Sequence, residues 1–399
     1  MKTPKALQAC VENVYTEMTY VAPAIVGVFV DKDLSAATAP SSDVYTDVIL
    51  FQMTFGKRCT SASVLVVTKT DAFWSDSAVG LPAANETQED DLIQLHLDIE
   101  NDDVGITGVF ERVVSYWNAI LRGSPMPKYA RPSDLALASC GILDEPFDDV
   151  NQGLKVFATV KSIDGEGGGL GYAGVCLTLD GQPVTGVMVL DQADLASLNE
   201  DGLLEHTIMH EIGHILGFGT IWTKQVKKLS SDHPLFKGKN ARKAYKRLGG
   251  KGKFVPVEGQ GGSGTAGGHW DEAVFEGELM TGWLSGRARL SSVTLGALKD
   301  LGYQVNEDFA ADYTLPSTVE QLKRRNTARE TVHNFTNDIL PYDYAVDIDS
   351  SGNVVGTIEL QAHASRMAMA QETTTENNDD DGDDEEEDEG EEEDAGSSR

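Results

Sequence analysis

Two histidines and a glutamate stand close together near the middle of this 399-residue chain. His210 and His214 are four positions apart in the run HEIGHILGFG, and Glu211 follows the first histidine directly. On a helix, side chains four residues apart project from one face, so both imidazoles can reach one zinc ion at about 2.0 to 2.1 Å. A glutamate beside such an ion can accept the proton of a water that the zinc activates. The run therefore predicts a hydrolytic zinc site with Glu211 as its general base.

A catalytic zinc ion needs a third protein ligand, and the residues after His214 indicate where it lies. Gly217 can adopt a positive φ angle and end the helix in a sharp turn. In the extended pattern HExxHxxGxxH, a third histidine follows three residues after this glycine, but here that position is Thr220. We therefore expect a ligand further downstream, and His269 in the run GGHWDEAVFEGELMTG is the best candidate. Met280, in the same run, is expected to form a Met-turn beneath the metal.

Two alternatives compete with this interpretation. A metallopeptidase could use a carboxylate as its third ligand, and Glu272, Glu276 and Glu278 all follow His269 closely. The chain could also be a non-catalytic module, for adhesion or binding, that has kept the fold of an enzyme. The intact Glu211 argues against such a module, because no structural role requires a carboxylate at that position.

The patterns around these residues predict a mixed sheet with helices. Apolar and polar residues alternate over residues 93–99 and 154–160, and residues 186–190 form a short apolar run, as is typical of strands. Apolar residues recur at helical spacing over residues 107–121 and again from residue 203 into the HEIGH run. A further short helix is expected after Ser291. Strands before and after helices predict an α+β fold.

The motifs and their order resemble the leishmanolysin-like family of metzincin peptidases. The similarity covers residues 92–316 and includes GGGLGYAG at 167–174, GVMVLDQADLASL at 186–198 and LKDLGYQVN at 298–306. The resemblance implies a metzincin-like catalytic domain with one zinc ion. It further implies that the zinc ligands are His210, His214 and His269, that Glu211 is catalytic and that Met280 forms the Met-turn. Such a protein would be an extracellular endopeptidase acting on proteins or peptides.

Several features differ from the trypanosomatid members of that family, which are lipid-anchored and rich in disulfides. This chain has four cysteines without CxxC spacing, so two disulfides or none are open. Cys59 is either a pro-region thiol that caps the zinc, as the resemblance implies, or an ordinary core or disulfide cysteine. The charged C-terminus predicts no lipid anchor. We also find no signal peptide and no apolar run of the roughly 18 residues that a membrane span needs.

Composition divides the chain into four predicted regions. Residues 1–88 contain apolar, β-branched runs and indicate a small β-rich region of unknown role. Residues 89–316 hold the motifs of the catalytic domain, and residues 317–370 form a C-terminal extension. Residues 371–399 form an acidic tail that we expect to be disordered.

Charge is spread unevenly over these regions. The net charge of −32 comes from 32 basic and 64 acidic residues, and it argues against a nucleic acid partner because phosphates would be repelled. The tail has 16 acidic residues and one arginine, a net of −15, whereas residues 221–253 have 11 basic residues and one aspartate, a net of +10. This basic insert lies between the second and third predicted ligands and should flank the cleft. The tail and the insert either pair within the chain or remain two independent charge runs.

Overall fold

The computed structural model of the chain describes residues 25–31, 47–53, 62–68, 91–99, 105–227, 233–262, 264–284, 288–317, 333–335, 338–362 and 364–365. Cys59 and the acidic tail lie outside these ranges, so the predictions made for them stay predictions. The first described strands form a small antiparallel sheet in the order β1-β3-β2, with the bounds Ile25–Asp31 for β1, Asp47–Met53 for β2 and Ala62–Thr68 for β3.

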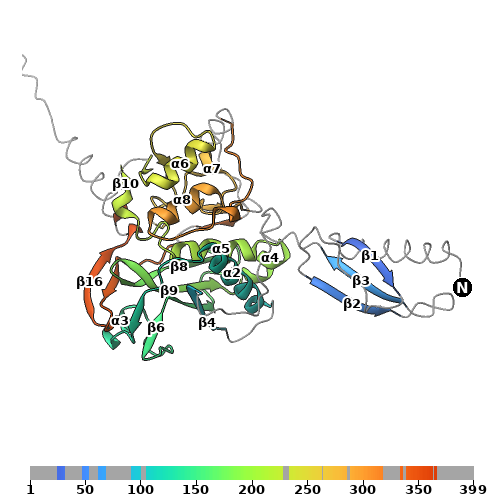
Figure 1. Cartoon of the computed structure of the whole chain (residues 1–399), viewed down its shortest axis with the longest axis horizontal. Coiled ribbons are helices and arrows are strands. Elements are labelled where there is room, and N and C mark those ends of the chain that lie inside the picture. The colour runs from blue at the N-terminus through green and yellow to red at the C-terminus, as the bar shows by residue number, and fades with distance from the viewer. Residues whose placement is uncertain are drawn as a thin grey trace, which may run out of the picture.

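A six-stranded mixed sheet organises the body that follows (Figure 1). Its order is β16-β15-β8-β9-β7-β4. The pairs β4–β7, β7–β9 and β8–β15 are parallel, whereas β8–β9 and β15–β16 are antiparallel. The predicted combination of helices with a mixed sheet is therefore confirmed. The strands are β4 Ile93–Asp98, β7 Leu154–Lys161, β8 Gly171–Leu179, β9 Gln182–Asp191, β15 Tyr344–Ile348 and β16 Val354–Glu359.

Two helices lie against this sheet and fix the position of the HEIGH run. Helix α2, Ile106–Ile120, and helix α5, Leu204–Ile215, pack on each other. The buried indole of Trp117 on α2 donates a hydrogen bond of 3.3 Å to the backbone carbonyl of Met209 on α5. Helix α5 also lies so close to β9 that a Cβ atom at Gly186 would be 2.1 Å from the side chain of Ile215. Helix α5 is therefore held by contacts with both the sheet and α2.

A second pair of helices packs together beyond α5. Helix α6, Lys239–Arg247, contacts α8, Ser292–Asp300, and a Cβ atom at Gly296 would be 2.7 Å from the backbone nitrogen of Ala241. The carboxylate of Asp300 accepts hydrogen bonds from the backbone N–H groups of Asn240 and Ala241, which begin α6. Because the last residue of α8 accepts hydrogen bonds from the first turn of α6, the basic insert is anchored to the body.

The remaining described elements are short. Among the described helices, none combines the length and the apolar composition needed to cross a bilayer. The short elements are β5 Lys128–Ala130, α3 Asp134–Ser139, β6 Val150–Gln152, α4 Leu195–Glu200, η2 Thr223–Gln225, β10 Val226–Lys227, β11 Leu235–Phe236, β12 Val255–Pro256, α7 Glu272–Phe275, β13 Trp283–Leu284, η3 Glu307–Phe309 and β14 His333–Asn334.

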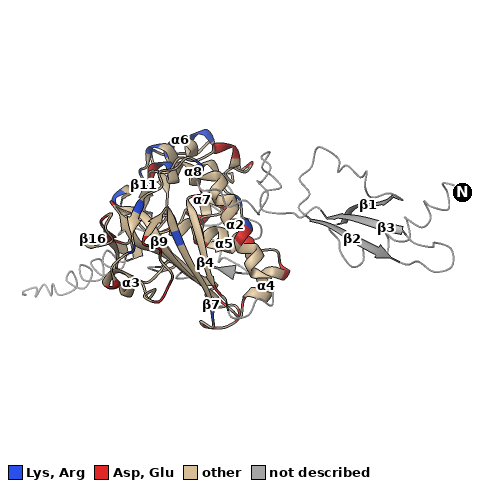
Figure 2. Cartoon of the chain, turned by 60° about the horizontal axis from the view of Figure 1, so that its bottom comes forward, with Lys and Arg blue, Asp and Glu red and all other residues tan. Residues whose placement is uncertain are grey.

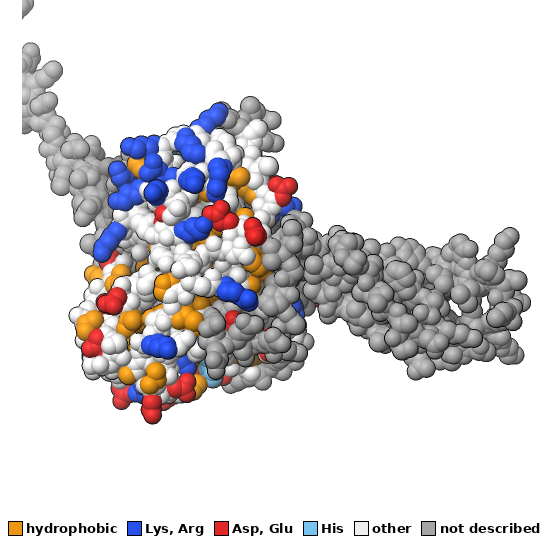
Figure 3. Space-filling view, in the orientation of Figure 1, with side chains coloured by type: hydrophobic (Ala, Val, Ile, Leu, Met, Phe, Trp, Pro, Cys, Tyr) orange, Lys and Arg blue, Asp and Glu red, His pale blue; other side chains and the backbone are white. Residues whose placement is uncertain are grey.

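The basic insert presents its charges on the surface. Lysine and arginine positions colour the ribbon of α6 blue in Figure 2, and basic side chains gather over this part of the surface in Figure 3. The exposed basic residues there are Lys237, Lys239, Lys243, Lys246, Arg247, Lys251 and Lys253. Residues 371–399 are not among the described ones, so pairing between this surface and the tail remains a prediction.

One disulfide is present among the described residues. Cys140, just after α3, is bonded to Cys176 on β8, and both side chains are buried. The bond links two segments 36 residues apart and answers the question of pairing for these two cysteines. Cys10 lies outside the described residues, as Cys59 does.

Candidate metal centre

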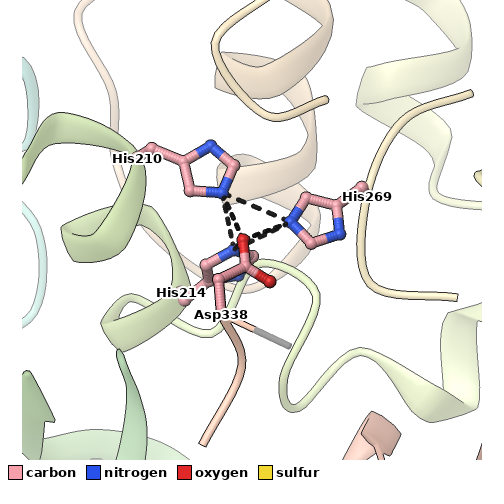
Figure 4. A group of neighbouring side chains, drawn as sticks. All are labelled: His210, His214, His269 and Asp338. Carbon is pink, nitrogen blue, oxygen red and sulfur yellow. Dashed lines mark hydrogen bonds and ion pairs between the residues drawn. The ribbon is translucent and has the colours of Figure 1, made fainter. Parts of the chain in front are cut away.

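Four side chains converge in the body of the protein: His210, His214, His269 and Asp338 (Figure 4). Two come from α5, one from the loop before α7 and one from the stretch between β14 and β15. All three histidines are 0% exposed and Asp338 is 1% exposed. Among the described residues, this is the group of ligand-type side chains that could hold a metal ion.

Helix α5 places the first two histidines. Its apolar residues Leu204, Ile208 and Ile212 recur every fourth position and are at most 2% exposed, which packs that face into the core. The helix ends at Ile215, and Gly217 has a φ angle of 99°, as predicted for a turn at this glycine. A side chain would be strained at that angle and would also meet Ile221.

The loop rich in glycine delivers His269 to these two histidines. The N–H of Glu258 donates to the carbonyl of His269 over 2.8 Å, so the loop closes on itself around the histidine. The close passage of the loop past the turn after α5 requires glycine, because a Cβ atom at Gly219 would lie 2.0 Å from the carbonyl oxygen of Gly268. The backbone contact between these two turns brings His269 next to His214.

The outer nitrogen of each imidazole faces a backbone carbonyl. The distances are 2.6 Å from His210 Nδ1 to the Leu279 oxygen, 2.9 Å from His214 Nδ1 to the Phe218 oxygen and 3.0 Å from His269 Nδ1 to the Thr265 oxygen. A carbonyl can only accept, so each Nδ1 carries the proton and donates it. In the neutral imidazole, each Nε2 then turns its lone pair toward the centre, which is the arrangement that orients histidines on a metal.

The spacing of the four inner atoms fits one tetrahedral ion. The Nε2 atoms are 2.9 Å apart for His210 and His214, 3.1 Å for His214 and His269 and 3.2 Å for His210 and His269. The Asp338 Oδ2 atom is 3.0, 3.5 and 3.0 Å from the Nε2 atoms of His210, His214 and His269. A tetrahedron of ligands at about 2.0 Å from a zinc ion has edges of about 3.3 Å. The donor set and its dimensions therefore fit zinc.

The pKa values of these groups follow from burial and from the one carboxylate. Burial lowers the pKa of His210 to about 4 and also lowers the pKa of His214, so both imidazoles are neutral at physiological pH. Burial acts in the same direction on His269, but the carboxylate of Asp338 outweighs it and raises the pKa of His269. Burial alone would raise the pKa of Asp338, yet the imidazoles, His269 first, hold it well below the usual range. Asp338 is thus a carboxylate.

Glu211 lies beside the cluster without belonging to it. It is 0% exposed, and neither carboxylate oxygen accepts a hydrogen bond from a described residue. Burial, and secondly the negative charge of Asp338, raise the pKa of Glu211 well above the usual range. A buried carboxyl group with unpaired oxygens is costly for stability, and such a cost is commonly tolerated at sites of chemistry.

Met280 lies under α5. Its N–H donates to the Glu278 carboxylate over 2.6 Å, and its carbonyl accepts from the N–H of Trp270 over 2.9 Å. Since Trp270 directly follows His269, the turn that carries Met280 is bonded to the backbone of the third histidine. Met280 is fully buried.

The structure does not bring the alternative carboxylates into the described metal-binding group. Glu272, Glu276 and Glu278 are absent from it. The carboxylate of Glu278 instead accepts hydrogen bonds from the backbone and hydroxyl of Ser291 and from the hydroxyl of Thr294. This glutamate connects the turn before Met280 to the start of α8.

Asp338 was missed by the sequence analysis. It lies 69 residues beyond His269, in the run FTNDILP, which matches no metal-binding spacing. The one available signal was an aspartate set among apolar residues late in the chain, where a buried carboxylate needs a partner. Its role is only visible once the fold brings residues 338–340 alongside β8.

Comparison with known proteins points to one family. Residues 140–320 match the family model described as leishmanolysin. The chain is 30% identical over 192 residues to the leishmanolysin of Leishmania donovani, an alignment that covers 44% of this chain and 32% of the relative. It is also 30% identical over 196 residues to the leishmanolysin homolog of Crithidia fasciculata, covering 45% and 29%. The ciliated left-right organizer metallopeptidase of Homo sapiens is 28% identical over 170 residues, covering 36% and 21%.

These matches confirm the resemblance inferred from the motifs. The aligned part of the chain spans about a third of the length of the two trypanosomatid relatives. The matched region includes α5, the glycine-rich loop and the turn at Met280, and it ends before Asp338. The aspartate therefore lies outside the part of the chain that the family model covers.

Proposed function

We propose that this chain, whose residues 140–320 match the leishmanolysin family model, is a zinc-dependent endopeptidase that hydrolyses internal peptide bonds of proteins or peptides. The observation that carries the proposal is the convergence of three Nε2 lone pairs within 3.2 Å of one another, next to the buried carboxyl group of Glu211. Imidazole lone pairs turned toward one another at this spacing repel unless a positive charge, from a metal ion or a proton, lies between them. A site of this kind serves hydrolysis because zinc polarises the scissile carbonyl and acidifies water.

His210, His214 and His269 are the residues that would hold the ion. Their Nδ1 protons are fixed on backbone carbonyls, so the imidazoles need no reorientation to bind it. The turn at Met280 supports α5 from below, which corresponds to the Met-turn of the metzincin-like domain that we propose for residues 89–316. Gly217 ends the helix so that the chain can return with His269.

Glu211 is the proposed general base and general acid. Its raised pKa suits a group that takes a proton from the attacking water and delivers it to the amine of the leaving peptide. During the attack, an O–H bond of water breaks, a C–O bond forms at the scissile carbonyl, and Glu211 holds the proton. When the C–N bond breaks, the same proton passes to the departing nitrogen, and the carboxylate is regenerated.

A test of this function is the cleavage of a denatured protein or a peptide library by the zinc-loaded chain, with and without a zinc chelator. We expect cleavage inside the peptides that stops with the chelator and returns when zinc is added back. Cleavage that the chelator does not affect would contradict the proposal. A zinc-loaded protein that binds peptides without cutting them, even after Asp338 is replaced by alanine, would favour the alternative of a binding or adhesion module.

A further inference from the structure

Asp338 reaches the metal centre on a stretch of chain that crosses over it. We call Phe335 and residues 338–340 the closing segment; each of its residues is at most 2% exposed. The ring of Phe335 lies flat on the imidazole of His210, with 3.8 Å between centroids and 4° between planes. This stacking covers one face of the first predicted ligand.

Backbone hydrogen bonds hold the closing segment at both ends. At one end, the N–H of Phe335 donates to the carbonyl of Gly282, and the hydroxyl of Thr265 donates to the carbonyl of Phe335, both over 3.1 Å. At the other end, the N–H of Ala173 on β8 donates to the carbonyl of Asp338 over 2.7 Å, and the N–H of Leu340 donates to the carbonyl of Ala173 over 3.0 Å. The segment thus bridges the loop of His269 and the sheet.

Within the described part of the chain, this arrangement closes the metal centre to a polypeptide. The three histidines and Glu211 are all 0% exposed, although a peptidase must place a peptide carbonyl at its metal. Catalytic zinc sites have three protein ligands and keep a fourth position open, whereas structural sites are closed by four. Here the Asp338 Oδ2 atom takes the fourth corner of the tetrahedron (Figure 4).

The closing segment also occupies the edge of β8 beside the metal. Extended peptides commonly bind by adding a strand to a free sheet edge through backbone hydrogen bonds. Both backbone groups of Ala173, the N–H and the carbonyl, are already bonded to the closing segment. A peptide could therefore use this edge only after the segment has left it.

We propose that Asp338 is an inhibitory fourth ligand and that the closing segment holds the peptidase in a latent form until it is displaced. The inference rests on the proposed function, because only an enzyme needs the fourth position to be open. Displacement removes one carboxylate from the centre and frees the backbone groups of Ala173. Asp338 is then a switch residue and takes no part in the hydrolysis itself.

The experiment compares the zinc-loaded full chain with its variants Asp338→Ala and Asp338→Asn. Asp343→Ala is the matched control, since Asp343 is an exposed aspartate five positions further along the same stretch. The first readout is the affinity for acetohydroxamate, a small zinc chelating probe that needs an open coordination position. The second readout is cleavage of a peptide library.

We expect acetohydroxamate to bind Asp338→Ala at least about tenfold more tightly than the unchanged chain. A site that is open in only a small fraction of the molecules shows an apparent affinity reduced by that fraction. Peptide cleavage should increase in parallel, and Asp343→Ala should change neither readout. Asp338→Asn keeps the shape of the side chain and should show the same direction of change. It therefore serves as the test if the alanine variant does not fold.

The outcomes separate the two proposals. Equal acetohydroxamate affinity in the unchanged chain and both Asp338 variants would overturn the inhibitory ligand, whatever the cleavage rates are. Tighter acetohydroxamate binding without any cleavage in any variant would overturn the peptidase instead, and Asp338 would be the fourth ligand of a structural site. Rapid cleavage by the unchanged chain together with slower cleavage by Asp338→Asn would also overturn the inhibitory role.

Discussion

Met280 packs directly against the backbone of Gly213, the residue that directly precedes the second histidine of the HEIGH run. A Cβ atom at Gly213 would lie 2.7 Å from the Met280 sulfur and 2.8 Å from its terminal methyl carbon. The contact couples the turn that follows His269 to the helix that carries His210 and His214. The relative position of the three histidines therefore depends on the absence of a side chain at one residue.

We predict that Gly213→Ala destabilises the protein by about 1–3 kcal/mol through overpacking, despite the better helix propensity of alanine. The measurement is the free energy of unfolding in denaturant. Gly108→Ala is the matched control, because Gly108 is also helical and its Cβ atom would meet only Arg112, at 3.6 Å. The control should stabilise by up to about 1 kcal/mol. Equal effects of the two substitutions would contradict tight packing at Met280.

In the Asp338→Ala background, where the fourth position is open, Glu211→Gln should retain bound zinc and lose peptide cleavage by a factor of about 10² to 10⁴, the usual contribution of a general base. The amide has nearly the same shape as the carboxyl group but cannot accept the proton of water. Zinc content is measured by elemental analysis, and cleavage is measured with a chromogenic or fluorogenic peptide. A variant that loses zinc as well would indicate that Glu211 supports the ligands rather than the reaction.

His269→Ala should lose zinc, because the remaining ligands no longer surround the ion. His233→Ala is the control: His233 is exposed and is not a member of the metal-binding group. Elemental analysis of both purified variants gives the comparison. Stoichiometric zinc in His269→Ala would mean that the third ligand has been assigned incorrectly.

Glu278→Gln should destabilise the protein by about 1–3 kcal/mol, since the amide NH₂ of the variant would face the N–H of Met280 and leave a buried donor unsatisfied. The half-buried Glu276→Gln is the control and should change the free energy of unfolding much less. Burial raises the pKa of Glu278, so its contribution to stability is greatest below the ordinary glutamate pKa and is lost as the pH rises through the raised value. The penalty for Glu278→Gln should accordingly be larger at acidic than at alkaline pH.

Removal of the disulfide should lower stability substantially. The double variant Cys140→Ala/Cys176→Ala opens a loop of 36 residues, for which loop-closure entropy predicts a loss of about 4 kcal/mol. The midpoint of thermal unfolding is the measurement, and the unchanged chain under a reducing agent is the comparison. No change in the midpoint would mean that the bond contributes little to folding of the body.

Much of the framework followed from local patterns in the sequence. The alternation of residues predicted the strands now seen as β4 and β7, and helical spacing predicted α2 within one residue at each end. These predictions succeed because one side of each element is buried in the core, so apolar residues recur in the sequence with the period of the helix or strand. The same holds for α5, where helical geometry alone puts two histidines on one face.

The parts that could not be predicted depend on contacts between distant segments. The residues, and then the resemblance, indicated His269 as the third ligand, and the structure brings it to α5. Its role as a ligand stays a prediction. Asp338 carried no periodic signal, because a single aspartate has no period, and its partners lie up to 128 residues away. The pairing of β15 with β8 could not be predicted either, since the pattern of a strand does not specify which strand is its neighbour.

The wide separation of the four converging side chains along the sequence has a consequence for how the protein folds. Contacts that join residues 55, 69 and 128 positions apart are slow to form, because closing each long loop costs conformational entropy before the contact contributes any stabilising energy. The two histidines of α5 can come together early, but the full set exists only when nearly the whole body has assembled. A metal ion would then bind late in folding and cross-link three segments that are distant in the sequence. The metal content would therefore report what fraction of the molecules has folded completely.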